Sequence, residues 1–324
     1  MEVDRLSLIK RLHENRSTIL PVAALIILLI FLRAFNPQFL ATHDSIVTLV
    51  YSISWFLIAA CGLTMVILMG SFDFSVPSIV RLAALGTAVF YPQFGWKGII
   101  LIFIVCLILG VLNGILLTKF NVPSFMATLG TAVVAEGLAK LFSGGFLQIV
   151  RDPAFLAISR TFIPPGIGLP SIFYWAIVLW AIALILTFAT PFGRKIYAIG
   201  LNLEGSKLAG INVTLIRIIV FTLSAAYAAV AGILYMAQLG GGAIELGEMQ
   251  TIPLLASVVV GGTALTGGIG GVHRTLLGVL VVNWLDTGMS MLAIDYNMRM
   301  VIFGIVAIIM AAATIDRRKI RFIK

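Results

Sequence analysis

Long apolar runs separated by short polar gaps dominate this chain. A helix needs about 20 apolar residues to cross the hydrocarbon core of a bilayer. The pattern predicts ten such segments, at residues 18–35, 46–69, 78–92, 98–118, 124–142, 171–190, 216–238, 251–265, 275–292 and 298–314. The third and eighth are short and flanked by Gly or Pro, which favours broken or re-entrant helices. We therefore expect an all-α polytopic membrane protein with about ten transmembrane helices, some of them short or broken.

These runs predict one transmembrane domain over 18–314, between an N-terminal segment (1–17) and a basic tail (315–324). The long gap at about 144–170 contains a short amphipathic piece near 153–160. The sequence leaves three interpretations of this outer loop open: it caps the mouth of a pathway, it binds a partner, or it lies on the lipid headgroups. Five predicted spans precede the loop and five follow it. An odd number in each half predicts an inverted 5+5 repeat, as in many transporters.

Composition and charge agree with a membrane protein. Only 11 % of the residues are charged and 60 % are hydrophobic, whereas about 25 % are charged in soluble domains. With the N-terminus placed in the cytoplasm, 15 of the 22 Lys and Arg residues fall in cytoplasmic segments. This positive-inside distribution predicts that both termini and the gap 191–215 are cytoplasmic. It also explains the net charge of +9 without a nucleic-acid partner.

The most distinctive polar gap is 198–213, AIGLNLEGSKLAGINV. Asn202 is a good N-cap residue, Glu204 falls in the first turn, where the helix dipole favours an anion, and Gly210 suits a left-handed helix end. These signals predict a short helix at 203–209. Two turns are not stable alone in water, so this helix either docks a partner or is an ordinary interfacial helix.

If the helix docks a partner, its expected apolar edge is Leu203, Leu208 and Ile211. Other polar residues stand within or beside the apolar runs. Asp73 is either a helix cap for the N–H groups of 75–76 or a group with a pairing or pathway role. Asn113 is either a helix–helix contact or a substrate contact.

Three further pairs of residues in the predicted spans carry polar, charged or thiol groups. Glu136 and Lys140 are four residues apart and predict an ion pair on one helix face. Asn283 and Asp286 fall in 275–292, where they serve either a subunit interface or the pathway. The thiols Cys61 and Cys106 lie inside apolar runs and predict buried cysteines rather than a disulfide or a metal site.

Four stretches, taken together, resemble the permease subunits of ribose-type ABC importers. The gap 198–213 resembles their cytoplasmic coupling loop through Ala198, Gly200, Asn202, Gly210 and Ile211. The other three stretches are 63–78 (Gly70, Asp73, Ser75, Val76), 110–131 (Gly110, Asn113, Gly114, Pro123, Thr128, Leu129, Gly130) and 261–280 (Gly261, Gly262, Gly267, Gly268, Gly270, Thr275, Leu276, Leu277, Gly278). Departures from the family pattern are Gly205, Ser206, Ala209, Pro77 and Arg274.

The resemblance assigns two groups of candidate site residues. The first would couple the chain to an ATPase and comprises Gly200, Asn202, Glu204, Gly205, Leu208, Gly210 and Ile211. The second would line a pathway or gate and comprises Asp73, Ser75, Asn113, Gly114, Thr128, Gly130, Gly261, Gly262, Gly267 and Gly268. Neither group is catalytic, and no metal site is expected.

The resemblance implies a transport subunit rather than an enzyme. The sequence has no G-x-x-x-x-G-K-[ST] motif, so ATP-Mg is expected on a separate ABC ATPase subunit and no cofactor on this chain. The other implied partners are a periplasmic solute-binding protein, a second permease copy (homodimer) or a paralogous permease, and membrane lipid.

The resemblance also implies a bacterial cytoplasmic (inner) membrane location and import of a small neutral solute, most simply a monosaccharide. Import of nucleosides or branched-chain amino acids stays open, as does an ion-coupled secondary transporter with inverted repeats.

Overall fold

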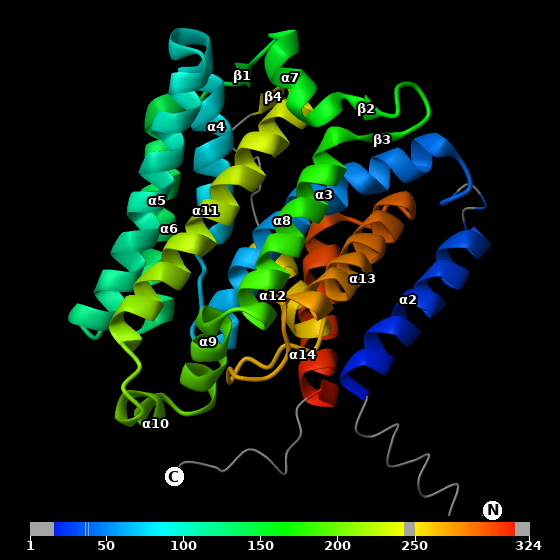
Figure 1. Ribbon diagram of the computed structural model, residues 1–324. Helices are drawn as coiled ribbons and strands as arrows, with labels where there is room; N and C mark the ends of the chain where they lie inside the picture. Colours follow the sequence, from blue (N-terminus) through cyan, green and yellow to red (C-terminus); the bar gives the residue numbers. More distant parts are fainter. Residues whose placement is uncertain (1–15, 36, 38, 243–249, 315–324) are drawn as a thin grey trace, which may run out of the picture.

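The computed structural model describes residues 16–35, 37, 39–242 and 250–314, so the tail 315–324 and nearly all of the N-terminal segment 1–17 lie outside the described residues. Helices dominate the described part (Figure 1). They are α2 (Arg16–Phe35), α3 (His43–Leu68), α4 (Val76–Phe94), α5 (Trp96–Lys119), α6 (Ser124–Ser143), α7 (Pro153–Arg160), α8 (Ser171–Leu184), the π-helical turn η1 (Ile185–Ala189), α9 (Pro191–Leu201), α10 (Leu203–Leu208), α11 (Val213–Leu239), α12 (Thr251–Val260), α13 (Val272–Met291) and α14 (Tyr296–Thr314). Two-residue strands pair antiparallel, β1 (Gln148–Ile149) with β4 (Gly241–Gly242) and β2 (Phe162–Ile163) with β3 (Leu169–Pro170).

Among the described residues, five helical segments are long and apolar enough to cross a membrane. These are α3, α5, α6, α8 together with η1, and α11. The other five predicted segments coincide with α2, α4, α12, α13 and α14. Of the two segments predicted to be short, the eighth is short, because helix α12 has only 10 residues. The third is not, because helix α4 has 19 residues. The count of about ten spans stays a prediction.

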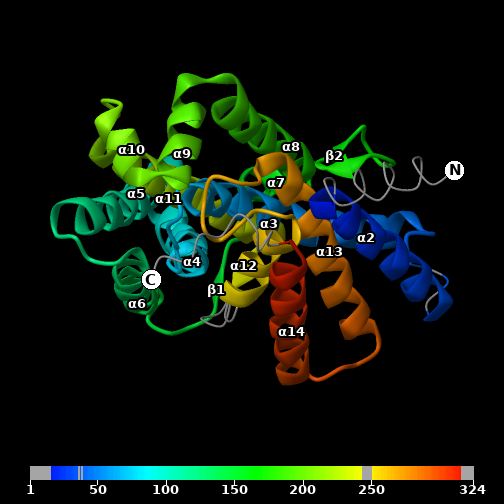
Figure 2. The ribbon, with the colours of Figure 1, turned by 90° about the horizontal axis from the view of Figure 1, so that it is seen from below.

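Helices α3 and α11 form the centre of the bundle. Every residue of α3 from Ser54 to Leu68 is buried, as expected for a helix that is apolar on all faces. Helix α11 packs against α3, α4 and α5. Figure 2 shows these central helices between α6 at one side of the section and α2 at the other. The core is therefore built around two long helices from different halves of the chain.

The contact between α5 and α11 requires small residues. A Cβ atom at Gly110 would lie 2.6 Å from the Cβ of Ala225, and one at Gly114 would lie 2.6 Å from the Cα of Ile218. Two glycines four residues apart let helix backbones approach closely in a membrane. This pair therefore explains why α11 lies directly on α5, and it places Gly114 at a helix contact.

The two ends of the bundle differ. Helices α9 and α10 lie at the end where α2 begins and α14 ends, and α7 lies at the opposite end with the strands (Figure 1). We call them the α10 end and the α7 end. The expected amphipathic piece near 153–160 is helix α7. The Oγ atom of Ser159 in α7 donates a 2.8 Å hydrogen bond to the Leu234 carbonyl of α11.

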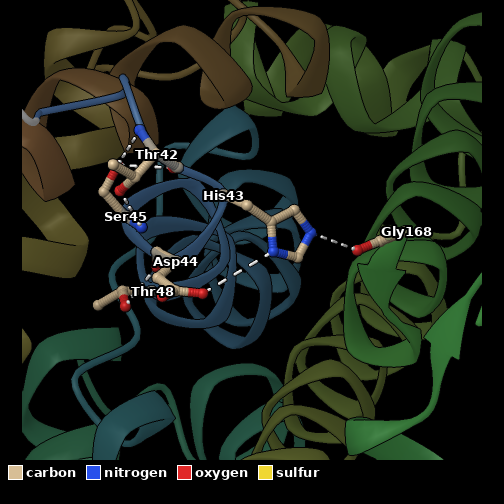
Figure 3. A network of polar contacts seen from close by, with 6 residues as sticks. All are labelled: Thr42, His43, Asp44, Ser45, Thr48 and Gly168. Atoms are coloured by element: carbon tan, nitrogen blue, oxygen red, sulfur yellow. Dashed lines mark hydrogen bonds and ion pairs between the residues drawn. The ribbon is translucent and has the colours of Figure 1, made fainter. Parts of the chain in front are cut away.

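The outer loop also contacts the start of α3, as Figure 3 shows. The His43 side chain places Nε2 3.1 Å from the carbonyl oxygen of Gly168. Thr42 caps the same helix by accepting a hydrogen bond from the Ser45 N–H at 3.2 Å. The loop 144–170 is thus attached to both central helices.

Candidate functional site

Capping interactions at both ends stabilise helix α10. The Asn202 Oδ1 atom accepts a hydrogen bond from the Gly205 N–H at 2.9 Å. At the other end Gly210 has a φ of +78°, which costs a residue without a Cβ atom little. Its N–H donates to the Lys207 carbonyl at 3.0 Å, as at many helix ends. The structure confirms the predicted short helix, its N-cap and its left-handed end.

The apolar edge of this helix differs from the prediction. Leu208 is 91 % exposed and Leu201, at the end of α9, is 67 % exposed. Leu203 and Ile211, which we expected on the same edge, are half-buried against the protein core. They hold α10 in place because their apolar side chains pack inward. The exposed surface at α10 therefore consists of Leu208, of Leu201 from the end of α9, and of the exposed Glu204.

Glycines join α9 to the end of α3 and to the loop before α13. A Cβ atom at Gly200 would lie 2.0 Å from the Leu68 carbonyl oxygen and 2.5 Å from the Gly268 nitrogen. A Cβ atom at Gly267 would lie 2.5 Å from the Gly70 nitrogen. We call Gly70, Gly200, Gly267 and Gly268 the glycine junction. It brings together three of the four stretches that the resemblance singled out.

The helix break between α3 and α4, residues 69–75, follows directly. Asp73 is 5 % exposed, and its Oδ1 atom accepts from the N–H of Ser75 at 3.0 Å and from its Oγ at 2.5 Å. Its Oδ2 atom accepts from the Ser224 Oγ in α11 at 2.7 Å. Asp73 therefore bonds the Ser75 N–H, as a helix cap would, and also joins the break to the central helix.

This network continues into α5 and α6. The Asn113 Nδ2 atom donates to the Ser75 Oγ at 3.0 Å, and the Asn113 Oδ1 accepts from the Thr131 Oγ1 at 2.7 Å. We call Asp73, Ser75, Asn113, Thr131 and Ser224 the Asp73 network. Each side-chain oxygen and nitrogen of the Asp73 and Asn113 pair meets at least one partner, so these buried polar groups are stabilised.

Hydroxyl groups from α6 bind the backbone of the break. The Phe72 N–H donates to the Ser124 Oγ and the Phe74 N–H donates to the Thr128 Oγ1, each at 3.1 Å. Backbone outside a helix must find such partners where lipid supplies none. The serine and threonine lie four residues apart on one face of α6, so their hydroxyls can bond two N–H groups that lie two residues apart along the break.

Three other gate candidates lie away from this network. Gly130 is on the exposed face of α6, with no atom within 4 Å of the position of a Cβ. A Cβ atom at Gly261 would lie 2.5 Å from the Arg274 carbonyl, which places this residue where α12 ends against the start of α13. Gly262 has a φ of +88° in the turn that follows.

Four residues in this region were missed by the sequence analysis: Ser124, Thr131, Ser224 and Leu68. Ser124 and Thr131 lie within a matched stretch but were not singled out. Ser224 lies in an apolar span outside every matched motif, and Leu68 takes part through its backbone carbonyl. A small polar residue within an apolar helix is typical of a helix–helix contact, and this signal could have found Ser224.

The ion pair predicted between Glu136 and Lys140 is wrong. The Glu136 Oε1 atom lies 3.1 Å from Nη1 of Arg81 in α4. Arg81 is buried and Lys140 is exposed, so the carboxylate pairs with the cation that water does not reach. The predicted burial of Cys61 and Cys106 is confirmed.

The chain matches known transport proteins over most of its length. Residues 45–311 match the family described as branched-chain amino acid transport system permease component. The ribose import permease protein RbsC of Bacillus subtilis is 32 % identical, covering 96 % of both chains. The L-arabinose transport system permease protein AraH of Escherichia coli is 30 % identical, covering 90 % of this chain and 88 % of its own. The autoinducer 2 import system permease protein LsrC of Salmonella typhi is also 30 % identical, covering 92 % and 86 %.

No solved structure matches the chain. The relatives are permease subunits of ABC importers, so the ion-coupled transporter left open by the sequence is set aside. The chain belongs to this permease family: it is a multi-pass transport subunit of an ABC importer and not an enzyme.

Proposed function

We propose that this permease imports a monosaccharide across the bacterial cytoplasmic membrane. The observation that carries the proposal is the surface at helix α10, where Leu208 of α10 and Leu201 at the end of α9 are exposed. Gly200 of the same α9 lies in the glycine junction. An exposed apolar residue beside polar ones fits a groove on a partner. In this proposal α10 docks an ABC ATPase, which binds and hydrolyses ATP-Mg.

The α10 end is the cytoplasmic end in this proposal. Arg194, Lys195, Lys207 and Arg217 lie in and around α9 and α10, and cytoplasmic loops are rich in such residues. The described chain also begins and ends at this end (Figure 1). Both termini would then be cytoplasmic, and the α7 end would face the solute-binding protein. A cavity of about 600 Å³ lined by Tyr91, Arg151 and Asp152 lies at the α7 end.

The path of coupling follows from the backbone contacts. A displacement of α10 moves Gly200 against Leu68 and Gly268, because these backbones are already in contact. Leu68 ends α3 and is followed by the helix break. The Asp73 network joins that break to α5, α6 and α11. The proposed motion therefore reaches α4, which follows the break, and α5, α6 and α11, which the network joins to it. Pathway or gate roles follow for Asp73, Ser75, Asn113 and Thr128.

Two copies of the chain, or one copy and a paralogue, would complete the pathway. The inverted 5+5 repeat belongs to the same proposal. Its support is that equivalent helices of the two halves make equivalent contacts. In the first half α4 and α5 pack on α11, and α6 packs on α4. In the second half α12 and α13 pack on α3, and α14 packs on α12. An inverted repeat places a solute site between halves that rock against each other.

The substrate class rests on relatives and on charge. Relatives are named for ribose, arabinose and autoinducer 2, and the family model is described by branched-chain amino acid transport. Charged residues are sparse, at 11 % of the chain. A neutral polyol needs hydrogen bonds rather than a charged clamp, so we favour a monosaccharide.

The test combines co-purification with uptake. The chain is purified gently from its native membrane, co-purifying proteins are identified by mass spectrometry, and ATP-driven uptake of radiolabelled D-ribose and L-arabinose is measured in the same cells. Leu208→Asp should remove the ATPase and abolish uptake, since loss of a docking anchor costs about 2 kcal/mol or more, roughly thirtyfold in affinity.

Leu147→Asp is the matched control, because Leu147 is 61 % exposed in the loop at the α7 end. It should leave the ATPase bound. Retention of the ATPase by both variants would contradict docking at α10. Uptake of neither sugar by the intact system would contradict the substrate class.

A further inference from the structure

A second polar region lies between α3, α11, α12, α13 and α14, apart from the Asp73 network. It surrounds a cavity of about 180 Å³. Pockets for drug-sized ligands are larger, roughly 300–1,000 Å³. The space therefore suits one small solute rather than a peptide or a nucleotide.

The polar lining of this cavity retains unused hydrogen-bonding capacity. Asn283 is 8 % exposed, and its one hydrogen bond to described residues runs from Nδ2 to the Val279 carbonyl at 3.2 Å. An amide side chain offers two donors and two acceptor lone pairs. Asp286 accepts from Arg299 through Oδ1 at 3.0 Å. Gln250 and Ser52 also line the space.

Aromatic rings form the other wall. Trp55 and Tyr235 both line the cavity, and their rings stack at a centroid distance of 4.5 Å with an angle of 18°. Phe56 and Phe303 lie beside them. Flat apolar rings facing a few amide and carboxylate groups form a typical site for a small polar molecule with an apolar face. A sugar ring has both parts, C–H groups on its face and hydroxyls at its edge.

The hydrogen bonds of two buried asparagines show how the lining of this cavity differs from a packed helix contact. Asn113 of α5 is bonded at both ends of its amide within the Asp73 network. Asn283 of α13 instead donates one hydrogen bond to the Val279 carbonyl of its own helix and lines the cavity. An empty cavity is usually lined by apolar groups alone. The polar groups here predict water or a solute in the space.

We propose that this cavity binds one neutral monosaccharide-sized polyol, with Asn283 and Asp286 bonding hydroxyl groups and the stacked pair of Trp55 and Tyr235 contacting its C–H groups. This inference rests on the proposed function and extends it, because it places a solute contact within a single permease chain. The site would hold the solute briefly after its release at the α7 end.

The test measures protection of a single introduced cysteine. Ser52→Cys places a thiol in the cavity lining, while the native Cys61 and Cys106 are buried and give the background. Ala154→Cys, on the exposed surface of α7, is the matched control. Purified protein reacts with a water-soluble methanethiosulfonate, alone and with D-ribose, L-arabinose, D-xylose or D-galactose.

At least one sugar should slow labelling at Ser52→Cys saturably. The slowing is about threefold when the sugar concentration is twice its Kd, and labelling at Ala154→Cys should not change. Asn283→Leu added to Ser52→Cys should remove the protection, and the milder Asn283→Ser should weaken it. The thermal unfolding midpoint of each purified variant checks that it is folded.

Failure of the cavity site and failure of the proposed function give different results. Absence of labelling at Ser52→Cys, or labelling that no sugar slows, overturns the cavity site even if the wild type imports sugar. Protection that survives Asn283→Leu overturns the contact assigned to that amide. Protection without ATP-driven uptake supports the cavity site and contradicts the proposed function instead.

Discussion

The backbone N–H of Gly268 donates a 2.8 Å hydrogen bond to the carbonyl oxygen of Leu68. This single bond joins the loop before α13 to the last turn of α3, and Gly200 of α9 rests against both residues. Leu68 and Gly268 are 200 residues apart in sequence, and Gly200 is 132 residues from Leu68 and 68 from Gly268. The glycine junction therefore joins α9, which directly precedes α10, to the helix break through direct backbone contacts.

Gly200→Ala is expected to disturb this route. The added Cβ atom would lie 2.0 Å from the Leu68 carbonyl oxygen, so the backbones must separate, and overpacking of this kind costs about 1–3 kcal/mol. We expect a lower thermal unfolding midpoint and reduced uptake per ATP hydrolysed, with the ATPase still bound. Gly130→Ala is the control, because that Cβ atom meets no atom within 4 Å. Equal behaviour of the two variants would contradict the close contact.

Ser224→Ala is expected to destabilise the protein through Asp73. The Oδ2 atom of Asp73 would lose its hydrogen bond from Ser224, and a buried acceptor left without its partner costs about 1–3 kcal/mol. Thr222→Ala in the same helix removes a hydroxyl that bonds only its own helix, at the Ile218 carbonyl. Thermal unfolding in detergent should therefore separate the two variants. A larger loss for Thr222→Ala would be inconsistent with the Asp73 network.

Glu136→Gln and Lys140→Gln test which cation the carboxylate pairs with. Removing the Glu136 charge leaves buried Arg81 without this partner, and we expect a loss of about 1–2 kcal/mol, reduced because Glu136 is 40 % exposed. Lys140→Gln should change stability by less than about 0.5 kcal/mol. Chemical or thermal unfolding of both variants decides the matter, since a Glu136–Lys140 pair would require losses of similar size.

Acid sensitivity at the α7 end should depend on Tyr91. The Tyr91 hydroxyl donates to Asp152 at 2.5 Å, and this hydrogen bond lowers the pKa of Asp152. A lowered pKa in the folded state stabilises the fold above the unfolded value of about 3.9. That contribution is lost as the pH falls through the folded pKa.

Tyr91→Phe should therefore reduce the dependence of the unfolding midpoint on pH between about 5 and 3. Tyr174→Phe is its control, because that hydroxyl donates to the Ile163 carbonyl and not to a carboxylate. Identical pH profiles for wild type and Tyr91→Phe would show that this hydrogen bond does not hold Asp152.

Sequence reasoning succeeded where the signals are local. The caps of α10 act within one or two turns, so Asn202 and Gly210 could be assigned from their neighbours alone. The partner of Asp73 could not, because Ser224 lies 151 residues away. The same limit explains the error at Glu136: the position of Lys140 is visible in the sequence, whereas Arg81, 55 residues away, is brought there only by packing of α4 on α6.

The cavity residues show a different limit. Trp55 and Tyr235 lie in apolar spans, where an aromatic side chain is typical of a packed core. Their stacking across α3 and α11 depends on how the two helices cross. Asn283 and Asp286 were visible as polar residues in a span, and the sequence left their role open between an interface and a pathway.

The helix break has one more consequence, which concerns chain length. Residues 71–73 contain no helical turn. Three residues span at most about 10 Å when extended and about 4.5 Å in a helix. Winding them would draw the start of α4 toward α3 by up to about 5 Å, close to the rise of one helical turn. The extended conformation of residues 71–73 would therefore allow α4 to shift along its axis by about one helical turn relative to α3 without any change in the covalent chain.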